Sequence, residues 1–504
     1  MIPQQHREEA RQTIPRLGLE DLEPKAAELP LTVVQDGKSD NGDGLTILTH
    51  EVPSNGILYF DLALDYSDIS DDDLPYLGLF SRMVLESGTS KLDSVALSRK
   101  IGTETGGIST SYYSDVKHKS GVIVDPDDVL LYFMVRGKAV YDKIDNLLDL
   151  VTEVLFDANL SNQKRAVEML KESKVRKQSS VISSGHTYAA SRMSSKRTFL
   201  GHLGEVTGGL TSVRDAGKIL DQAEKDWPSV QRHLQKIRDT LLKRNSAVIN
   251  LTADARTLQA AQAAVDSLVK RLPKNPSTIP IAESPLLKSW HKIKQDIDSK
   301  PRVNEGFVMP SQVNYVGKSA SIYKPGEPIS SATTVVARYL STGYLWDNVR
   351  VVGGAYGGFA RFSESSGNMV YLSYRDPNLY KTLQIYDAAA DNLLNSEIHA
   401  EDILQAVVGA VGDLDSPLSP DQKGFTSMCQ YLVGETAEDR QTSRDQVLKT
   451  SASDFKSFAQ RLKKVETDGI SVVFGSQTAL DQANADIQDA TQKFILEPAF
   501  TDTP

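Results

Sequence analysis

Two stretches of the chain show the same order of features, and this repeat limits the folds that the chain can adopt. Each stretch has a Gly-Gly pair, a strand, a second apolar strand and an amphipathic helix. The stretches comprise Gly106-Gly107, 131–136 and 141–155 in the first copy, and Gly353-Gly354, 370–375 and 380–394 in the second. Such a repeat predicts an internal duplication, with two α/β domains of one ancestry.

The rest of the 504 residues fits this division. Strand-like and helical segments alternate in both parts, and the Pro-rich stretch 273–285 marks a boundary between them. We therefore predict an α/β (α+β) chain with domains at 31–272 and 301–504, joined by a linker at 273–300. Residues 1–30 are polar and linker-like.

The composition disfavours several classes of protein. The formal net charge of −10 disfavours a nucleic-acid binder, which needs a basic surface. No apolar run approaches the about 18–20 residues that span a bilayer. Cys429, the only cysteine, cannot form an intramolecular disulfide. Residues 1–9 resemble neither a signal peptide nor a good transit peptide, so we expect either no targeting segment or one encoded upstream.

Two ligand-binding motifs are incomplete. The stretch Val316-Gly317-Lys318-Ser319 ends like a phosphate-binding loop, but Gln312 stands where the first glycine is required. Five acidic residues within 65–73 lack the glycine of a calcium loop, so they are expected to lie at a solvated helix start.

No zinc motif can be identified. The histidines are too far apart for a His-x-x-x-His or His-x-x-Glu-His pair on one helical face. The eight are His6, His50, His118, His186, His202, His233, His291 and His399. Each is expected to be an ordinary surface or core residue and Cys429 a buried structural thiol, while a zinc site built from distant residues stays open.

The segment Val349–Gly358 carries the candidate functional residues. Arg350 and Tyr356 stand six residues apart, with four glycines in the same segment. Because β-branched residues precede the glycines, the range 349–362 is predicted as a strand with both side chains on one face. A fixed cation beside a phenol suits a peptide carbonyl and a developing oxyanion. The simpler alternative is a Gly-bent sheet corner with a surface Arg and a packed Tyr.

Several longer motifs carry a resemblance to a known family. They lie at Gln312–Lys318, Tyr344–Arg350, Gly353–Gly358, Tyr371–Asn378, Leu74–Phe80 and Glu86–Thr89. Together they resemble the presequence protease family of pitrilysin-type zinc metallopeptidases, over about residues 15–500.

This resemblance implies a fold and a larger assembly. Members have four homologous domains, each a mostly antiparallel sheet flanked by helices, in two halves that close around a peptide chamber. The chain resembles the second half, with 31–272 and 301–504 as the third and fourth domains. Residues 1–30 would then be the tail of the helical hairpin that joins the halves.

The family's zinc, its His-x-x-Glu-His ligands and the catalytic Glu belong to the first half. The helix here that matches the zinc helix carries Leu79, Arg82 and Met83 at roughly those positions. None of these can replace the family's set, so no metal ligand is expected in this chain.

The resemblance gives Arg350 and Tyr356 a role, because the family has an Arg and a Tyr that reach across the closed chamber. Tyr356 would donate a hydrogen bond to the oxyanion, and Arg350 would anchor the substrate backbone. Gly353 and Gly354 would contact substrate beside them.

We therefore expect the C-terminal half of a zinc metalloendopeptidase that degrades presequences and other unstructured peptides in the mitochondrial matrix or chloroplast stroma. Its partners would be the N-terminal catalytic half and unfolded, basic peptides, without nucleic acid or a membrane span. Two alternatives stay open: a non-catalytic peptide-binding or scaffold chain, and an incomplete gene model.

Overall fold

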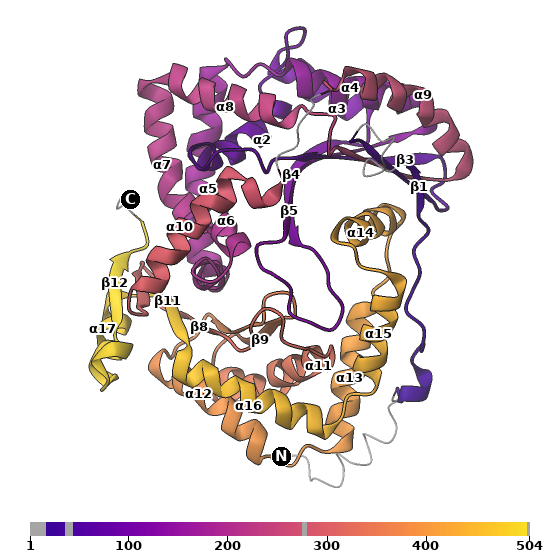
Figure 1. The fold of residues 1–504 in the computed structure, drawn as a ribbon. Coiled ribbons are helices and arrows are strands. Elements are labelled where there is room, and N and C mark those ends of the chain that lie inside the picture. Colours follow the sequence, from indigo (N-terminus) through magenta and orange to yellow (C-terminus); the bar gives the residue numbers. More distant parts are fainter. Residues whose placement is uncertain (1–16, 36–43, 275–279, 501–504) are drawn as a thin grey trace.

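The computed structural model describes residues 17–35, 44–274 and 280–500, which form two six-stranded sheets (Figure 1). The first sheet has the order β1-β2-β6-β3-β5-β4, and the second has the order β12-β7-β11-β8-β10-β9. The first sheet consists of β1 (Thr32–Gln35), β2 (Thr46–Glu51), β3 (Ile57–Asp65), β4 (Ile108–Val116), β5 (Val129–Val140) and β6 (Val248–Ala253). The second consists of β7 (Asn304–Val308), β8 (Tyr315–Ser321), β9 (Gly357–Ser363), β10 (Asn368–Tyr374), β11 (Ile470–Gly475) and β12 (Phe494–Pro498).

The two sheets share one topology over five strands. β2 is parallel to β6, as β7 is to β11, and the next three pairs in each sheet are antiparallel. The strands that follow Gly107 and Gly354, β4 and β9, both lie at a sheet edge. This equivalence confirms the predicted repeat and the predicted α/β fold. The sheets differ at the opposite edge, because β1 is antiparallel to β2 whereas β12 is parallel to β7.

Helices cover one face of each sheet and complete its core. In α4, Leu147, Val151 and Leu155 recur every four residues and are almost fully buried against the first sheet. Each such side chain contributes about 1.5–3 kcal/mol when buried. In the first part the helices are α2 (Leu77–Glu86), α3 (Ser94–Glu104), α4 (Ile144–Asp157), α5 (Gln163–Ser194), α6 (Phe199–Thr207), α7 (Leu210–Lys225), α8 (Trp227–Leu241) and α9 (Ala255–Arg271).

The second sheet has an equivalent layer, in which α12 and α16 pack together against β8. Buried Phe455 and Leu462 of α16 belong to this core. The helices of this part are α10 (Pro285–Ser299), α11 (Ala332–Tyr339), α12 (Tyr380–Asn395), α13 (Ala400–Leu414), α14 (Pro420–Val433), α15 (Ala437–Leu448), α16 (Ala452–Asp468) and α17 (Gln477–Asp486).

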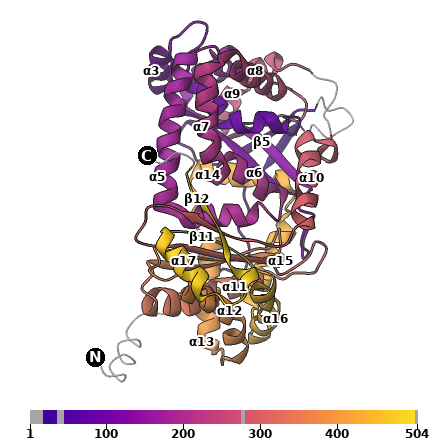
Figure 2. The same ribbon diagram turned by 90° about the vertical axis from the view of Figure 1, so that its left-hand side faces the viewer.

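The other face of each sheet is covered by a helix from the other part of the chain. α5 packs on β8, β10 and β11, and α14 packs on β2 and β6 (Figure 1). Within β10, Leu372 belongs to the cluster under α5 while its neighbour Tyr371 belongs to the core with α12, so the two layers lie on opposite faces. Figure 2 shows α5 extending from near α3 toward the second sheet. The two parts are therefore interlocked by an exchange of helices.

A glycine makes each of these helix–sheet contacts close. A Cβ added to Gly185 of α5 would lie 2.4 Å from the ring of Tyr315, and one added to Gly424 of α14 would lie 1.7 Å from Oγ1 of Thr252. Three side-chain atoms of Thr252 would lie within 3.0 Å of the Cβ at 424, so rotation of that hydroxyl alone does not relieve the overlap.

Gly424→Ala is expected to lower the free energy of unfolding by about 1–3 kcal/mol, because it overpacks the contact between α14 and the first sheet. Gly412→Ala is the matched control on the exposed side of α13, where an added Cβ meets nothing within 4 Å. There the better helix propensity of Ala should raise stability by up to about 1 kcal/mol. Urea titration measures both, and a stabilising Gly424→Ala would contradict the close contact.

The segments expected as linkers are partly ordered. Residues 1–16 of the expected hairpin tail lie outside the described residues. Beyond them, the backbone oxygens of Glu23 and Pro24 accept hydrogen bonds from Arg444 and Gln441 of α15. The range 273–300 contains α10, which buries Leu286, Leu287 and Trp290 in the first core. The boundaries at 31–272 and 301–504 stay a prediction.

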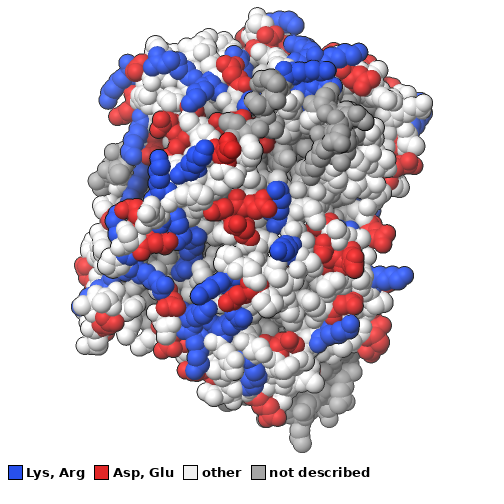
Figure 3. Space-filling model, in the orientation of Figure 1, with Lys and Arg blue, Asp and Glu red and all other residues white. Residues whose placement is uncertain are grey.

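Charges of both signs are interspersed over the face of the molecule drawn in Figure 3, where no continuous basic stripe is seen. No helix within the described ranges is long and apolar enough to cross a bilayer. The loop-like stretch at 316–319 lies within β8, where Lys318 is buried and forms an ion pair with Asp387, so it is not a phosphate-binding loop.

Candidate functional site

Arg350 lies on a π-helical segment that follows α11. The segment comprises η5 (Leu340–Tyr344) and η6 (Trp346–Val352). Leu340, Leu345 and Val349 are buried and stand five and four residues apart, a wider spacing than the 3.6 residues of an α-helical turn. The wider helix therefore turns one apolar stripe toward the core. Such π-helical turns are rare and occur often at functional sites.

The prediction of a strand over 349–362 is wrong in its first half, because β9 begins only at Gly357. A Cβ added to Gly358 would lie 3.2 Å from Val349 and 3.3 Å from Leu345, so β9 packs directly on the π-helical segment. Burial of Val349 in a helix outweighs the preference of valine for strands. Arg350 and Tyr356 consequently do not share the face of a strand.

Gly353 and Gly354 reverse the chain between these residues. Gly354 has φ +80°, a conformation that favours glycine. A Cβ on Gly353 would lie 2.5 Å from the oxygen of Val349, and the Gly353 oxygen accepts a hydrogen bond of 2.6 Å from Asn378. Both glycines thus build the turn, and their contact with substrate stays a prediction.

Tyr356 is held by its backbone and by a neighbouring ring. Its N–H donates to the oxygen of Tyr374 at 3.0 Å, which fixes it beside the end of β10. The two rings are T-shaped, with centroids 5.7 Å apart. Tyr356 is nevertheless 66% exposed, and within the described ranges its hydroxyl has no hydrogen-bond partner. The hydroxyl is therefore free to meet a ligand.

The guanidinium of Arg350 lies over two aromatic rings. It is 4.1 Å from the ring centre of Trp346 and 5.7 Å from that of Tyr356. No carboxylate in the described part of the chain forms an ion pair with it, so its N–H donors remain available. Val351 and Val352 beside it are 64% and 71% exposed. The site thus joins a cation, a phenol and exposed apolar surface.

Trp346 was not identified from the sequence as a site residue. On a helix, residues four apart are neighbours, so the spacing of Trp346 and Arg350 could have revealed the stacking. The expectation that the helix ended at 346 and a strand began at 349 concealed it.

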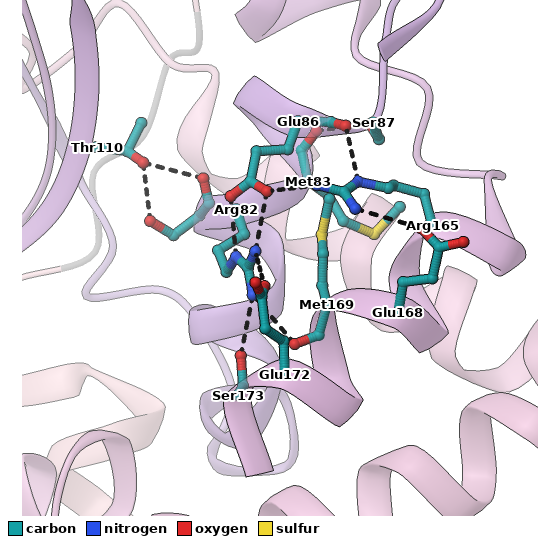
Figure 4. A network of polar contacts seen from close by, with 11 residues as sticks. Arg82, Met83, Glu86, Ser87, Thr110, Arg165, Glu168, Met169, Glu172 and Ser173 are labelled. Atoms are coloured by element: carbon teal, nitrogen blue, oxygen red, sulfur yellow. Dashed lines mark hydrogen bonds and ion pairs between the residues drawn. The ribbon is translucent and has the colours of Figure 1, made fainter. Parts of the chain in front are cut away.

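The helix expected to match the zinc helix is α2, and its residues do not fit a metal. Leu79 and Met83 are buried in the first core. Arg82 donates to both oxygens of Glu86 at 2.9 Å and to Glu172 of α5 at 2.6 Å (Figure 4).

Arg165 of α5 completes this network by donating to Glu86 at 2.8 Å and to Glu168 at 3.2 Å (Figure 4). Hydrogen bonding from Arg82 lowers the pKa of Glu86, which keeps this carboxylate charged and paired. The charges here hold α2 to α5 and leave no free ligand set. Throughout the described ranges, no group of three or more His, Cys, Asp or Glu residues could hold a metal ion.

Cys429 lies half-buried on α14. Burial is the main cause that raises the pKa of its thiol to about 11, so the group is protonated at neutral pH. This environment suits a packed thiol and not a nucleophile.

The fold of the chain is that of M16 peptidase domains. The structure titled as a peptidase M16 inactive domain from Pseudomonas fluorescens matches with a TM-score of 0.55 and 15% identity, over 89% of this chain and 98% of that one. A conserved protein from Enterococcus faecalis matches with a TM-score of 0.58 and 14% identity, over 86% of this chain and 97% of that one.

Sequence comparison gives the family. The model of the PreP C-terminal domain matches residues 304–477, and the model of a region associated with M16 peptidases of group C matches residues 2–217. Presequence protease 1, chloroplastic/mitochondrial, of Arabidopsis thaliana is 36% identical over 94% of this chain. The chain belongs to the presequence protease family of pitrilysin-like peptidases and corresponds to its C-terminal half. It spans 42% of the length of that relative, and the resemblance inferred from the motifs is confirmed.

Proposed function

We propose that the chain works as the C-terminal half of an organellar zinc metalloendopeptidase that degrades targeting peptides and other unstructured peptides. The observation that carries this proposal is the pair Arg350 and Tyr356, whose donors are unpaired within the described ranges and lie together on an exposed surface. In a chain of the presequence protease family, such donors are suited to contact a peptide backbone when the chamber closes.

The two side chains would act at different stages of cleavage. The planar guanidinium of Arg350 can donate two parallel hydrogen bonds to backbone carbonyls, and stacking on Trp346 limits the directions in which it points. The hydroxyl of Tyr356 can donate to the oxygen of the scissile carbonyl as negative charge develops there. Closure of the halves would exclude water and strengthen both contacts.

The metal of the complete enzyme would be held by the N-terminal half, whether fused or separate. The residues of α2 in this chain do not fit zinc, so this half would contribute substrate contacts and closure. This division would make activity depend on the meeting of the two halves.

The substrates would be unfolded and basic. Targeting peptides of mitochondria and chloroplasts carry positive charge, and a chain of net charge −10 favours their approach. Relatives named mitochondrial or chloroplastic support the matrix or the stroma as the location.

One observation favours a second function. Because Arg82, Leu79 and Met83 occupy the helix that resembles the family's zinc helix, the chain could bind peptides without cleaving them, as a scaffold for another subunit. Cleavage by the assembled halves separates the two functions.

The chain alone is expected to bind far less than one zinc per molecule and to cleave no peptide. The test clears the purified chain with a chelator, reloads it with zinc, and measures bound metal and the cleavage of a fluorogenic peptide. One tightly bound zinc with chelator-sensitive cleavage would contradict the proposed division between halves.

A further inference from the structure

A cavity of 890 Å³ lies where the two parts of the chain meet, away from Arg350 and Tyr356. Its walls come from the end of α5, from α6 and α10, and from the ends of β7, β11 and β12. A cavity of this size can hold a small metabolite, since ligand sites are typically about 300–1,000 Å³.

The walls carry charges of both signs, and the acidic side chains are all paired. The lining carboxylates are Glu205, Asp296, Asp298, Glu305, Asp468 and Glu497, and each forms an ion pair. Glu497 is paired with Arg214, which is not among the lining residues. The carboxylates therefore leave one lining cation without a counter-charge.

That cation is Arg197. The lining cations are Arg192, Lys196, Arg197, Lys294, Lys300 and Arg302, and all but Arg197 form an ion pair with a carboxylate of the described chain. Arg197 donates to the oxygen of Ser319 at 2.5 Å and to the hydroxyl of Ser321 at 3.2 Å. Its Nε is buried and has no hydrogen-bond partner within the described ranges.

The surroundings of Arg197 oppose its charge. Burial is the main cause that lowers the pKa of Arg197 to about 10, and nearby Arg302 lowers this pKa further. A partly buried guanidinium with an unsatisfied donor costs free energy unless an anion accompanies it. A second arginine in the same cavity increases that cost, and it also strengthens the attraction for a doubly charged anion.

We propose that this cavity binds a small phosphate-bearing molecule, with Arg197 as its anchor and Arg302 as the second positive charge. The guanidinium fork matches the oxygens of a phosphate group. Arg302 is held in place by the carboxylate and the backbone oxygen of Asp468, at 3.2 and 2.8 Å. Because the walls come from both parts of the chain, the bound anion would fasten α5 and α6 to the second sheet.

The test measures melting temperature and calorimetric binding of inorganic phosphate and pyrophosphate to the full chain, with sodium chloride adjusted to constant ionic strength. In the wild type, about 10 mM of either anion should raise the melting temperature by about 1–3 °C. Arg197→Met should remove this shift. Without anion it should melt at the wild-type temperature or above, because an apolar side chain replaces an unpaired charge.

Two further variants keep the proposal falsifiable if Arg197→Met folds poorly. Arg197→Lys retains the charge but loses the fork, so phosphate should bind at least several-fold more weakly. Lys300→Met removes a lining charge that Asp296 already neutralises, so binding should persist. The absence of phosphate binding in the wild type, or equal binding by wild type and Arg197→Lys, would overturn the proposal. Peptidase activity enters none of these readouts.

Discussion

Tyr356→Phe is expected to lower kcat by about a hundred- to thousandfold in the enzyme assembled with its metal-bearing half, because it removes one hydrogen-bond donor to an oxyanion. The Michaelis constant should change little, since such a donor acts mainly in the transition state. Steady-state cleavage of a fluorogenic peptide measures both constants. The ring stays in place in this variant, so its packing against Tyr374 is retained.

Stability provides the control for this result. Tyr356 is 66% exposed and its hydroxyl has no hydrogen-bond partner in the described ranges, so the melting temperature should stay at the wild-type value. If the hydroxyl had only a structural role, Tyr356→Phe would melt earlier and turn over normally. Wild-type turnover by this variant would contradict the role proposed for Tyr356.

Arg350→Lys is expected to lower kcat/KM by about ten- to hundredfold, which corresponds to the loss of a charged hydrogen bond worth about 1.5–3 kcal/mol. Lysine keeps the charge but lacks the planar fork and stacks less well on Trp346. Because Arg350 would hold the substrate backbone before and during the reaction, KM should rise more than kcat falls. Titration of peptide against the initial rate separates the two constants.

The matched control is Arg461→Lys on α16, where an arginine also lies over a tyrosine ring. Its guanidinium is 3.8 Å from the ring centre of Tyr323 and is paired with Glu327 at 2.6 Å. This change should leave KM and kcat at their wild-type values. An equal rise of KM in both variants would show that Arg350 acts through general stability and not through substrate.

Local patterns were sufficient to predict the repeat of the fold. The alternation in β5 and the four-residue spacing of Leu147, Val151 and Leu155 in α4 depend on which face meets the core, and this is written along each segment. The exchange of α5 and α14 between the two parts could not be predicted. It depends on close contacts such as Gly424 with Thr252, which lie far apart in the sequence.

The candidate site shows the same limit. Arg350 and Tyr356 were identified from residue type, spacing and resemblance, and the structure brings their side chains together. The valines at 349, 351 and 352 suggested a strand, but the burial of Leu345 and Val349 against β9 imposes a π-helical segment. The stacking of Trp346 on Arg350 follows from that segment, so it could not be foreseen from a strand.

Complementation tests the central claim most directly. The measurement compares the cleavage of an unstructured basic peptide by this chain, by a metal-bearing N-terminal half of the presequence protease family, and by the two mixed. The account predicts cleavage only in the mixture, with activity lost on chelation and reduced by Tyr356→Phe in this chain. Efficient cleavage by the N-terminal half alone, unchanged when this chain is added, would contradict the account.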